Sequence, residues 1–392
     1  MNRLRTLARA LRTATNRALA LAARAASRRA VEPPRVVLVH RVGRLGDGAA
    51  AWPALVALRR RYPDARLVLL TSTGEDEAAG MAEWLERSAK NERLVDEVRR
   101  YRPSAVARDA RAFLRELRAL SIDRWQALPQ AGTTPWTELR NLAFARAAGA
   151  RQLSGFAVGG LRWLGPLGGS AWDRRLAPDL PEYRRLLALI GADDDGARLA
   201  IEPDARAVGA LVLAPGAARS ANRWPLERFR AVAARELECG GRVVVVGGAG
   251  ERELAATLLT ELGGGVAPAR ALDLAGRTDA LGTLAVLAAA RAVLTNDSGV
   301  AHLAGLVGAP TLVVSSARDV AGRWAARGAV VLRENPSCGP CWRDDCHLDH
   351  RCLNDITTER VLLALDAIAP LRRGSPPSTV DKRLSLGSPS RP

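Results

Sequence analysis

The sequence predicts an α/β protein with two doubly wound domains, and three features of the 392-residue chain indicate this class. Short apolar runs, such as Val36–His40, alternate with stretches of helical character, as in parallel sheets covered by helices on both faces. A polar stretch at 191–206 interrupts the alternation once. The apolar content of 48% in a chain of this length is sufficient for two such domains.

In the first half, the pattern predicts strands at 36–40 and 67–71 on either side of a helix at 49–61. The Tyr62-Pro63-Asp64 turn ends that helix. Further helices are expected at 105–120, 137–148 and 182–190, and a Gly-rich loop at 159–169. Strand and helix alternate again from Leu211 to a last helix at 357–368.

These elements divide the chain into five parts. They are a basic N-terminal extension at 1–34, a Rossmann-like domain at 35–190, a linker at 191–206, a second Rossmann-like domain at 207–370 and a tail at 371–392. The tail is rich in Ser, Pro, Gly and Arg and is expected to be disordered. Asp193-Asp194-Asp195 in the linker is interpreted as a solvated acidic turn, and a cleft is expected between the domains.

The net charge of +17 is concentrated at the two ends of the chain. Residues 1–34 carry +7 and residues 371–392 carry +4, which leaves about +6 for the body. The sequence has no aromatic-basic stripe and no nucleic-acid motif, so no nucleic-acid partner is expected. No apolar run approaches the roughly 18 residues that span a membrane, and no signal-peptide h-region is evident.

The N-terminal extension allows two interpretations. Small and apolar residues recur at helical spacing with arginines around them, as in a basic helix that lies on an anionic membrane surface. These residues are Leu4, Leu7, Leu11, Ala14, Ala18, Leu21 and Ala25. Because nearly half of this face is alanine, a frayed or disordered extension is favoured over the membrane helix.

The most informative segment is Asn296-Asp297-Ser298-Gly299-Val300-Ala301-His302, which lies between two apolar runs. This order predicts a strand, a polar turn and a helix. The unpaired N–H groups and the positive dipole of the helix start form an anion site. Asp297 or Ser298 is expected to cap the helix, Gly299 to admit a ligand to the backbone, and His302 to face the same opening. An ordinary capped helix is the alternative.

A second such turn, Arg41-Val42-Gly43-Arg44-Leu45-Gly46-Asp47-Gly48, follows the first strand. Asp47 would lie at the carboxyl edge of the sheet, where α/β proteins bind ligands, and is the leading catalytic candidate as a general base. The alternative for Asp47 is a helix cap. Gly46 and its neighbouring glycines would let substrates approach the backbone, and Arg41 and Arg44 would contact an anionic acceptor.

A third block comprises Leu211–Gly216, Asn222-Arg223-Trp224-Pro225, and Val243–Gly248 with Glu251. In this order and spacing the three blocks resemble glycosyltransferase family 9, the heptosyltransferases of lipopolysaccharide assembly. The resemblance runs from about Arg35 to about Ile368. It implies the GT-B architecture, in which two Rossmann-like domains face a central cleft, with Asp47 as the base.

The donor is expected in the C-terminal half. No acidic metal-binding motif is evident at a strand end, so backbone amides and cations would neutralise the diphosphate, and no cofactor is expected for catalysis. The expected donor-binding residues are Arg219, Arg223, Glu251, Asp297, Ser298, Gly299 and His302, with Glu251 on the ribose. The chain departs from the family at Asn222, where a lysine is usual, and at Ala217 and Ala218.

Four of the five cysteines, Cys338, Cys341, Cys346 and Cys352, form a C-x2-C-x4-C-x5-C cluster with His347 and His350 between them. A structural zinc or iron site is the preferred interpretation, and two disulfides or four reduced thiols are the alternatives. A cytosolic location disfavours disulfides.

Together these features predict an inverting, metal-independent glycosyltransferase. It would transfer a heptose or related sugar from a nucleotide sugar such as ADP-heptose to a saccharide or glycolipid of the lipopolysaccharide-core type. The expected location is cytoplasmic, with peripheral contact at the inner face of the inner membrane. A non-catalytic or divergent sugar-nucleotide-binding relative, or a nucleotide-sugar epimerase, is the alternative.

Overall fold

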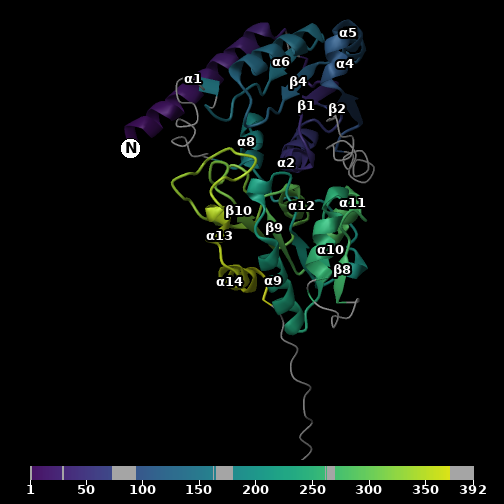
Figure 1. The fold of residues 1–392 in the computed structure, drawn as a ribbon. Helices are drawn as coiled ribbons and strands as arrows, with labels where there is room; N and C mark the ends of the chain where they lie inside the picture. The colour runs from purple at the N-terminus through teal and green to yellow at the C-terminus, as the bar shows by residue number, and fades with distance from the viewer. Residues whose placement is uncertain are drawn as a thin grey trace, which may run out of the picture.

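A computed structural model of the chain describes residues 2–28, 31–72, 94–161, 163–164, 180–260, 262 and 270–370. Two α/β domains are stacked end to end (Figure 1). The doubly wound two-domain architecture predicted from the sequence is confirmed. The tail at 371–392 lies outside the described residues, as does most of the 159–169 loop.

The N-terminal domain contains a parallel sheet in the order β3-β2-β1-β4-β5. Its strands are β1 (Val36–His40), β2 (Arg66–Ser72), β3 (Glu97–Tyr101), β4 (Arg124–Ala127) and β5 (Gln152–Ser154). Its helices are α1 (Asn2–Ala26), α2 (Leu45–Arg61), α4 (Pro103–Arg108), α5 (Ala110–Ala119), α6 (Pro135–Ala147) and α8 (Glu182–Leu189). The helix expected at 105–120 is divided, because the Asp109 side chain accepts from the Ala112 N–H and starts a new helix.

The C-terminal domain contains a second parallel sheet in the order β11-β10-β9-β6-β7-β8. Its strands are β6 (Leu211–Ala214), β7 (Val243–Val245), β8 (Ala271–Asp273), β9 (Ala292–Asn296), β10 (Thr311–Ser315) and β11 (Val330–Arg333). The α-helices are α9 (Leu226–Glu238), α10 (Arg252–Thr260), α11 (Ala280–Ala289), α12 (Gly299–Val307), α13 (Arg351–Asn354) and α14 (Thr358–Ile368). Short 3-10 turns are η3 (Ala205–Ala207), η4 (Ser220–Asn222) and η5 (Ala249–Glu251).

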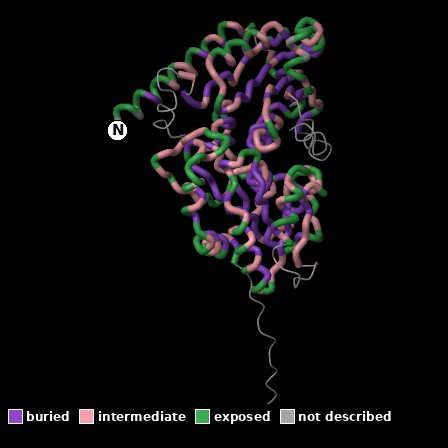
Figure 2. The backbone as a smooth tube through the Cα atoms, viewed as in Figure 1, coloured by how far each residue is buried: buried purple, intermediate pink, exposed green. Residues whose placement is uncertain are grey.

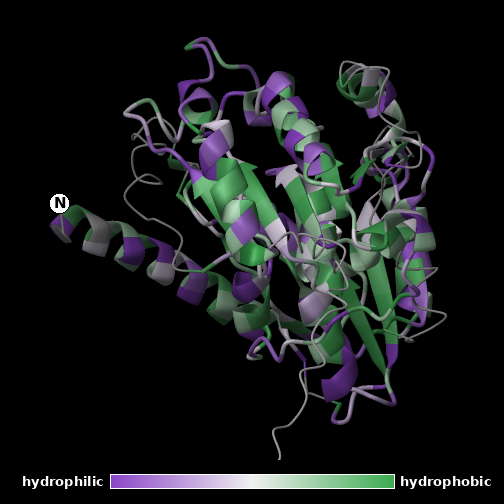
Figure 3. Cartoon of the chain, turned by 90° about the horizontal axis from the view of Figure 1, so that it is seen from below, coloured by the Kyte–Doolittle hydropathy of each residue, from purple (hydrophilic) through white to green (hydrophobic). Residues whose placement is uncertain are grey.

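The inner strands of both sheets, such as β1, β2, β9 and β10, are hydrophobic and mostly buried, as a sheet covered on both faces requires (Figures 2 and 3). The edge strands β3, β8 and β11 are partly exposed. One core cluster is shared by the two domains, because α2 packs against α12, with α8 beside α2 and α11 beside α12. Leu55 and Leu186 belong to it on one side, and Leu284 and Leu303 on the other. This shared core fixes the position of α2 relative to α12.

The N-terminal extension is an ordered helix, so the favoured interpretation of a frayed extension is wrong. Leu19 and Ala23 of α1 are buried in the core beneath the N-terminal sheet. The Asn16 side chain donates to the Val158 carbonyl at 3.1 Å and accepts from the Val158 N–H at 2.8 Å. The seven-residue stripe singled out in the sequence lies on the exposed side of α1, including Leu7 and Leu21. The helix is therefore held against the N-terminal domain by a second, buried face that includes Leu19 and Ala23.

The segment between α8 and η3 contains no helix or strand over residues 191–204. Its acidic turn is not fully solvated as expected. Asp194 is half-buried and forms an ion pair with Arg327, and Asp195 pairs with Arg60. Within the part of the chain that the structure describes, no helix is long and apolar enough to cross a bilayer.

Candidate active site

Two glycine-bearing turns, one from each domain, meet where α2 and α12 begin (Figure 1). A Cβ atom added to Gly46 would lie 3.2 Å from the Gly299 Cα and 3.4 Å from the His302 Cδ2. The turn after β1 is therefore in contact with the turn after β9. Parallel strands bring both turns to the carboxyl edges of their sheets, so residues about 250 positions apart form one site.

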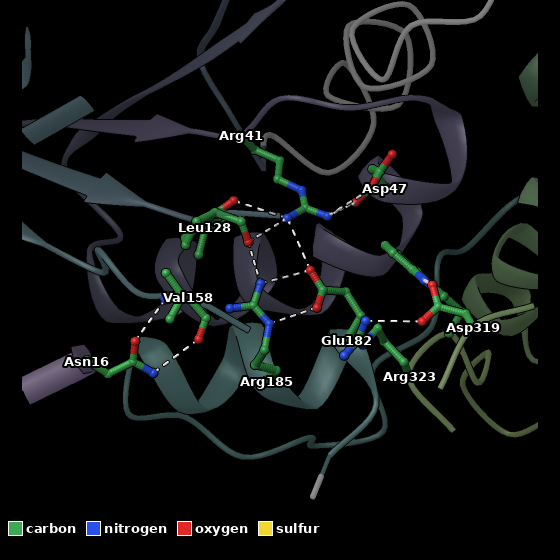
Figure 4. A network of polar contacts seen from close by, with 11 residues as sticks. Asn16, Arg41, Asp47, Leu128, Val158, Glu182, Arg185, Asp319 and Arg323 are labelled. Atoms are coloured by element: carbon green, nitrogen blue, oxygen red, sulfur yellow. Dashed lines mark hydrogen bonds and ion pairs between the residues drawn. The ribbon is translucent and has the colours of Figure 1, made fainter. Parts of the chain in front are cut away.

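Asp47 lies in the first turn of α2, and its carboxylate is held from two sides, of which Figure 4 shows that of Arg41. Its Oδ2 accepts from the Arg44 backbone N–H at 2.9 Å, and its Oδ1 accepts from Arg41 at 3.4 Å. Burial raises the pKa of Asp47, and this outweighs the opposing effects of Arg41 and the Arg44 N–H. The side chain remains 18% exposed, so Asp47 both caps the helix and can reach a substrate hydroxyl.

Gly43 makes this geometry possible. Its φ of +144° is a conformation that side chains rarely adopt, and an added Cβ would lie 2.4 Å from the Asp47 Cβ. The turn therefore requires glycine at this position, because Asp47 folds back against it.

Arg41 is fully buried, which corrects the expectation that it contacts the acceptor. Its NH1 donates to the Leu128 and Pro129 carbonyls, both at 3.1 Å, and to Glu182 at 3.3 Å (Figure 4). Its NH2 donates to the Asp47 carbonyl at 3.2 Å. Arg41 thus positions Asp47 and carries no surface for a ligand. Arg44, by contrast, is exposed at the mouth of the turn.

Glu182 on α8 is a site residue that sequence reasoning missed. Its Oε2 accepts from the Arg185 Nε at 2.7 Å and its Oε1 accepts from Arg41, so one carboxylate joins two guanidinium groups. Burial favours its neutral form, but Arg185 and Arg41 together hold the pKa of Glu182 below its usual value. Its backbone N–H donates to the Arg323 carbonyl of the C-terminal domain at 2.9 Å. No local signal reveals it, because Arg41 is 141 residues away in sequence and a Glu–Arg pair at i,i+3, like that with Arg185, is common on helix surfaces.

The start of α12 is not capped by a side chain. Ser298 occupies the N-cap position without a capping hydrogen bond, and its Oγ lies 3.2 Å from the Thr295 Oγ1. The Asp297 carboxylate accepts from the Ser315 Oγ at 3.4 Å. The expectation that one of the two caps the helix is therefore wrong. The N-terminal amides of α12 remain available to an anion.

Asp297 and His302 are both perturbed by their surroundings. Burial, reinforced by the charge of Asp319, raises the pKa of Asp297 to about 6. Burial lowers the pKa of His302 to about 4, so its imidazole is neutral near pH 7 and can donate one hydrogen bond. His302 packs edge-on against Trp324, with the ring centroids 6.2 Å apart.

Glu251 lies between the ends of β6 and β7. Its Oε2 accepts from the Gly248 N–H at 2.7 Å. An added Cβ would lie 1.8 Å from the Glu251 Oε1 if placed on Gly216, and 2.6 Å from its Oε2 if placed on Gly247. Both glycines therefore make room for this carboxylate at the carboxyl edge of the sheet.

The 217–223 loop contains the departures from the family pattern. Asn222 accepts from the Ser316 Oγ at 2.7 Å and donates to the Asp297 carbonyl at 3.4 Å, so it braces the α12 turn. Arg219 pairs with Asp344 at 2.6 Å and remains 46% exposed. Arg223 is exposed, and its Nε donates to the Ala217 carbonyl at 3.0 Å.

The cysteine loop packs on this same region. The Asp344 carbonyl accepts from the Ala221 N–H at 3.0 Å and from the Ser220 Oγ at 3.1 Å. Cys338, Cys341 and Cys346 line one cavity of about 300 Å³, and all five cysteines are unpaired. Burial raises the pKa of Cys352, and the other three thiols add to that rise. Among the described residues, no three metal-binding side chains stand at ligand distances.

The comparisons with known proteins agree with this geometry. Residues 190–351 match the model of glycosyltransferase family 9 (heptosyltransferase). Lipopolysaccharide heptosyltransferase 2 of Escherichia coli strain K12 is 29% identical over 150 residues, which are 38% of this chain and 43% of that protein. The matching segment thus spans less than half the length of this curated relative.

Solved structures share the fold over most of the chain. E. coli ADP-heptose lps heptosyltransferase II has a TM-score of 0.60 at 21% identity and covers 85% of this chain and 98% of its own. The family 9 glycosyl transferase of Veillonella parvula has a TM-score of 0.64 at 17% identity, and the match covers 87% of this chain and 99% of that protein. The iron-containing dodecameric glycosyltransferase TibC of enterotoxigenic E. coli has a TM-score of 0.52 at 16% identity, with 87% and 77% covered.

The fold, two parallel-sheet α/β domains, is the GT-B fold shared with these solved structures. Within this fold, residues 190–351, less than half of the chain, match glycosyltransferase family 9 (heptosyltransferase). The resemblance that the sequence motifs indicated is therefore confirmed.

Proposed function

We propose that this protein transfers a heptose or related sugar from a nucleotide diphosphate donor, such as ADP-heptose, to a saccharide or glycolipid of the lipopolysaccharide-core type. The observation that carries the proposal is the contact between the Asp47 turn and the uncapped start of α12. One turn offers a base and the other an anion receptor, within one site.

In this reaction the Asp47 carboxylate accepts the proton of the acceptor hydroxyl while that oxygen attacks the anomeric carbon. The leaving diphosphate takes up the negative charge at the α12 amides, with His302 as a further donor. Attack from the face opposite the leaving group inverts the anomeric centre. Glu251 would hold the ribose hydroxyls, and Arg219 and Arg223 would face the phosphates. Arg44 is the remaining candidate for contact with an anionic acceptor.

Donor-dependent transfer by the purified protein tests this proposal. With ADP-heptose and a lipopolysaccharide-core oligosaccharide, we expect a glycosylated product with inverted anomeric configuration, detected by mass spectrometry and NMR. Free sugar released without acceptor would favour the epimerase class. Donor binding without any transfer would favour a non-catalytic relative.

The cysteine loop is proposed to bind one zinc or iron ion through Cys338, Cys341, Cys346 and Cys352. Three of these thiols line one cavity, the fourth is near them, and the Leu348 N–H donates to the Cys346 Sγ at 3.4 Å. The role is structural, because the loop braces the 219–222 segment. Elemental analysis should find about one metal equivalent, lost in a Cys341→Ser variant and retained in Cys239→Ser. Metal-free native protein with four titratable loop thiols would contradict this.

We further propose a cytoplasmic protein that contacts the inner face of the inner membrane through α1. Leu4, Leu7, Leu11 and Leu21 are between 39% and 65% exposed on one side of the helix. Exposed arginines such as Arg3, Arg17 and Arg24 accompany them, as expected for a helix at an anionic lipid surface.

A further inference from the structure

A cavity of about 450 Å³ lies between α1, the loop at 157–159 and α8, outside the contact between the two turns. This volume falls within the range of pockets that hold small ligands, roughly 300–1,000 Å³. Its lining includes Arg12 and Arg17 from α1, Arg185 from α8 and Arg323 from the C-terminal domain. Among the described residues, Glu182 is the carboxylate of this lining.

The α1 wall of the cavity is held in place by specific contacts. Both polar atoms of the Asn16 amide bond to the Val158 backbone (Figure 4), and Leu19 and Ala23 anchor the next turns of α1 in the core. Arg12 and Arg17 flank Asn16 in sequence. The part of the α1 backbone that carries these two arginines is therefore fixed opposite α8.

The charges around the cavity are unequal. Glu182 is engaged by Arg185 and Arg41, and Arg323 pairs with Asp319 at 3.1 Å. The NH1 nitrogen of Arg185 is buried without a hydrogen-bond partner. Four guanidinium groups line the cavity, and Glu182 and Asp319 engage two of them but leave the Arg185 NH1 without an acceptor, so the cavity suits an anion with several acceptor oxygens. Guanidinium groups bind phosphate and carboxylate oxygens through paired hydrogen bonds.

We propose that this cavity binds a phosphate or carboxylate group of the sugar acceptor, remote from the hydroxyl that reacts. The assignment to the acceptor rests on the proposed glycosyl transfer. The site also connects to the catalytic turn, since Glu182 belongs to the cavity lining and Arg41 joins it to Asp47. On this account α1 is part of the substrate site as well as a peripheral helix.

Calorimetric titration with glucose 6-phosphate, inorganic phosphate and glucose tests the site, with saturating ADP present to occupy the donor turn. The full-length protein should bind the two phosphates and not glucose. An R12Q/R17Q variant should bind glucose 6-phosphate roughly tenfold more weakly, which corresponds to about 1.4 kcal/mol. An R12K/R17K variant should recover most of the affinity. The matched control is R3Q/R24Q, which removes the same charge from α1 outside the cavity.

Equal losses in R12Q/R17Q and R3Q/R24Q would indicate a general charge effect and overturn the site, as would unchanged affinity in both. Vesicles containing phosphatidylglycerol separate the two sources of phosphate. Loss of vesicle binding in R12Q/R17Q, with glucose 6-phosphate binding intact, would assign these arginines to the membrane and overturn the cavity.

Transfer kinetics keep this inference distinguishable from the proposed function. R12Q/R17Q should raise KM for a phosphorylated acceptor and leave KM for its dephosphorylated form unchanged. Equal KM values for both acceptors in wild type and variant would overturn the site while transfer itself stands. Absence of transfer with every acceptor would refute the proposed function. The phosphate titration would still show whether the cavity binds an anion.

Discussion

The two turns that meet in this protein share one local structure and differ in how their helix starts are satisfied. Each follows a buried parallel strand, bears glycine and opens a helix. At α2, Asp47 supplies the carboxylate that satisfies the Arg44 N–H, and a buried arginine holds it. At α12, neither Asp297 nor Ser298 caps the amides. The first turn thus presents an acid-base group and the second an anion receptor. Whether a side chain caps the helix start therefore determines which chemical group each turn offers to a substrate.

The largest effect should follow from removing the base at the first turn. Asp47→Asn keeps an oxygen that can accept from the Arg44 N–H, so fold and donor binding should be retained. Turnover should fall by about 10²–10⁴-fold, because the amide cannot accept the proton. The matched control is Asp109→Asn, which alters an exposed carboxylate cap on α5 and should leave turnover unchanged. Near-normal turnover in Asp47→Asn would place the base elsewhere.

The second prediction concerns the buried charge on which the first turn depends. Arg41→Met should destabilise the fold by about 3 kcal/mol, because it breaks a buried ion pair and leaves three carbonyls without their donor. Since Arg41 lowers the pKa of Asp47, its loss should also move the acid limb of the pH–rate profile to higher pH. Arg44→Gln, at an exposed position, should change stability by less than about 0.5 kcal/mol. Chemical denaturation measures the free energy of unfolding of both variants. Equal values would mean that the buried Arg41 stabilises the fold no more than the exposed Arg44 does.

A third prediction uses Glu138, a buried acid at the carboxyl edge of the N-terminal sheet. Burial raises its pKa to about 7, despite hydrogen bonds from Thr133 and Asn141. Its folded pKa therefore exceeds its unfolded value of about 4.3. The stability that its protonation contributes is present below pH 4.3 and is lost as pH rises through about 7. The loss should approach about 3.6 kcal/mol by pH 8.

Denaturation curves between pH 4.5 and 8 for wild type and Glu138→Gln check this prediction. The glutamine variant should lack that part of the pH dependence, because it carries no ionisable group there. Glu116→Gln, on the exposed side of α5, should retain the wild-type slope. Parallel curves for Glu138→Gln and wild type would mean that this carboxyl is ionised throughout the range.

The sequence predicts the parts of this site that are local, and misses those that depend on distant partners. Apolar runs locate β1 and β9, and the glycines between strand and helix identify both turns. Asp47 stands out because its residue type and its place after a strand are sufficient to identify it as a candidate base. Glu182 does not, because Arg41 lies 141 residues away and only the packing of α8 on α2 brings the two together. For the same reason the burial of Arg41 could not be foreseen.

The N-terminal helix shows the same limit. Its exposed leucines form the more evident pattern in the sequence, whereas Ala8, Leu19 and Ala23 on the buried face are small or widely spaced. Packing therefore stabilises a helix whose apolar stripe, taken alone, suggested a frayed extension.

Donor binding by Ser298 variants shows whether the uncapped start of α12 receives the diphosphate. Ser298→Asp should cap the helix and raise thermal stability. Its carboxylate should also occupy the amides and repel the phosphates, so calorimetry should show ADP affinity reduced at least about tenfold. Ser298→Asn, a neutral cap of similar size, should weaken ADP binding less. Raised stability with ADP affinity unchanged in Ser298→Asp would mean that the diphosphate binds elsewhere in the protein.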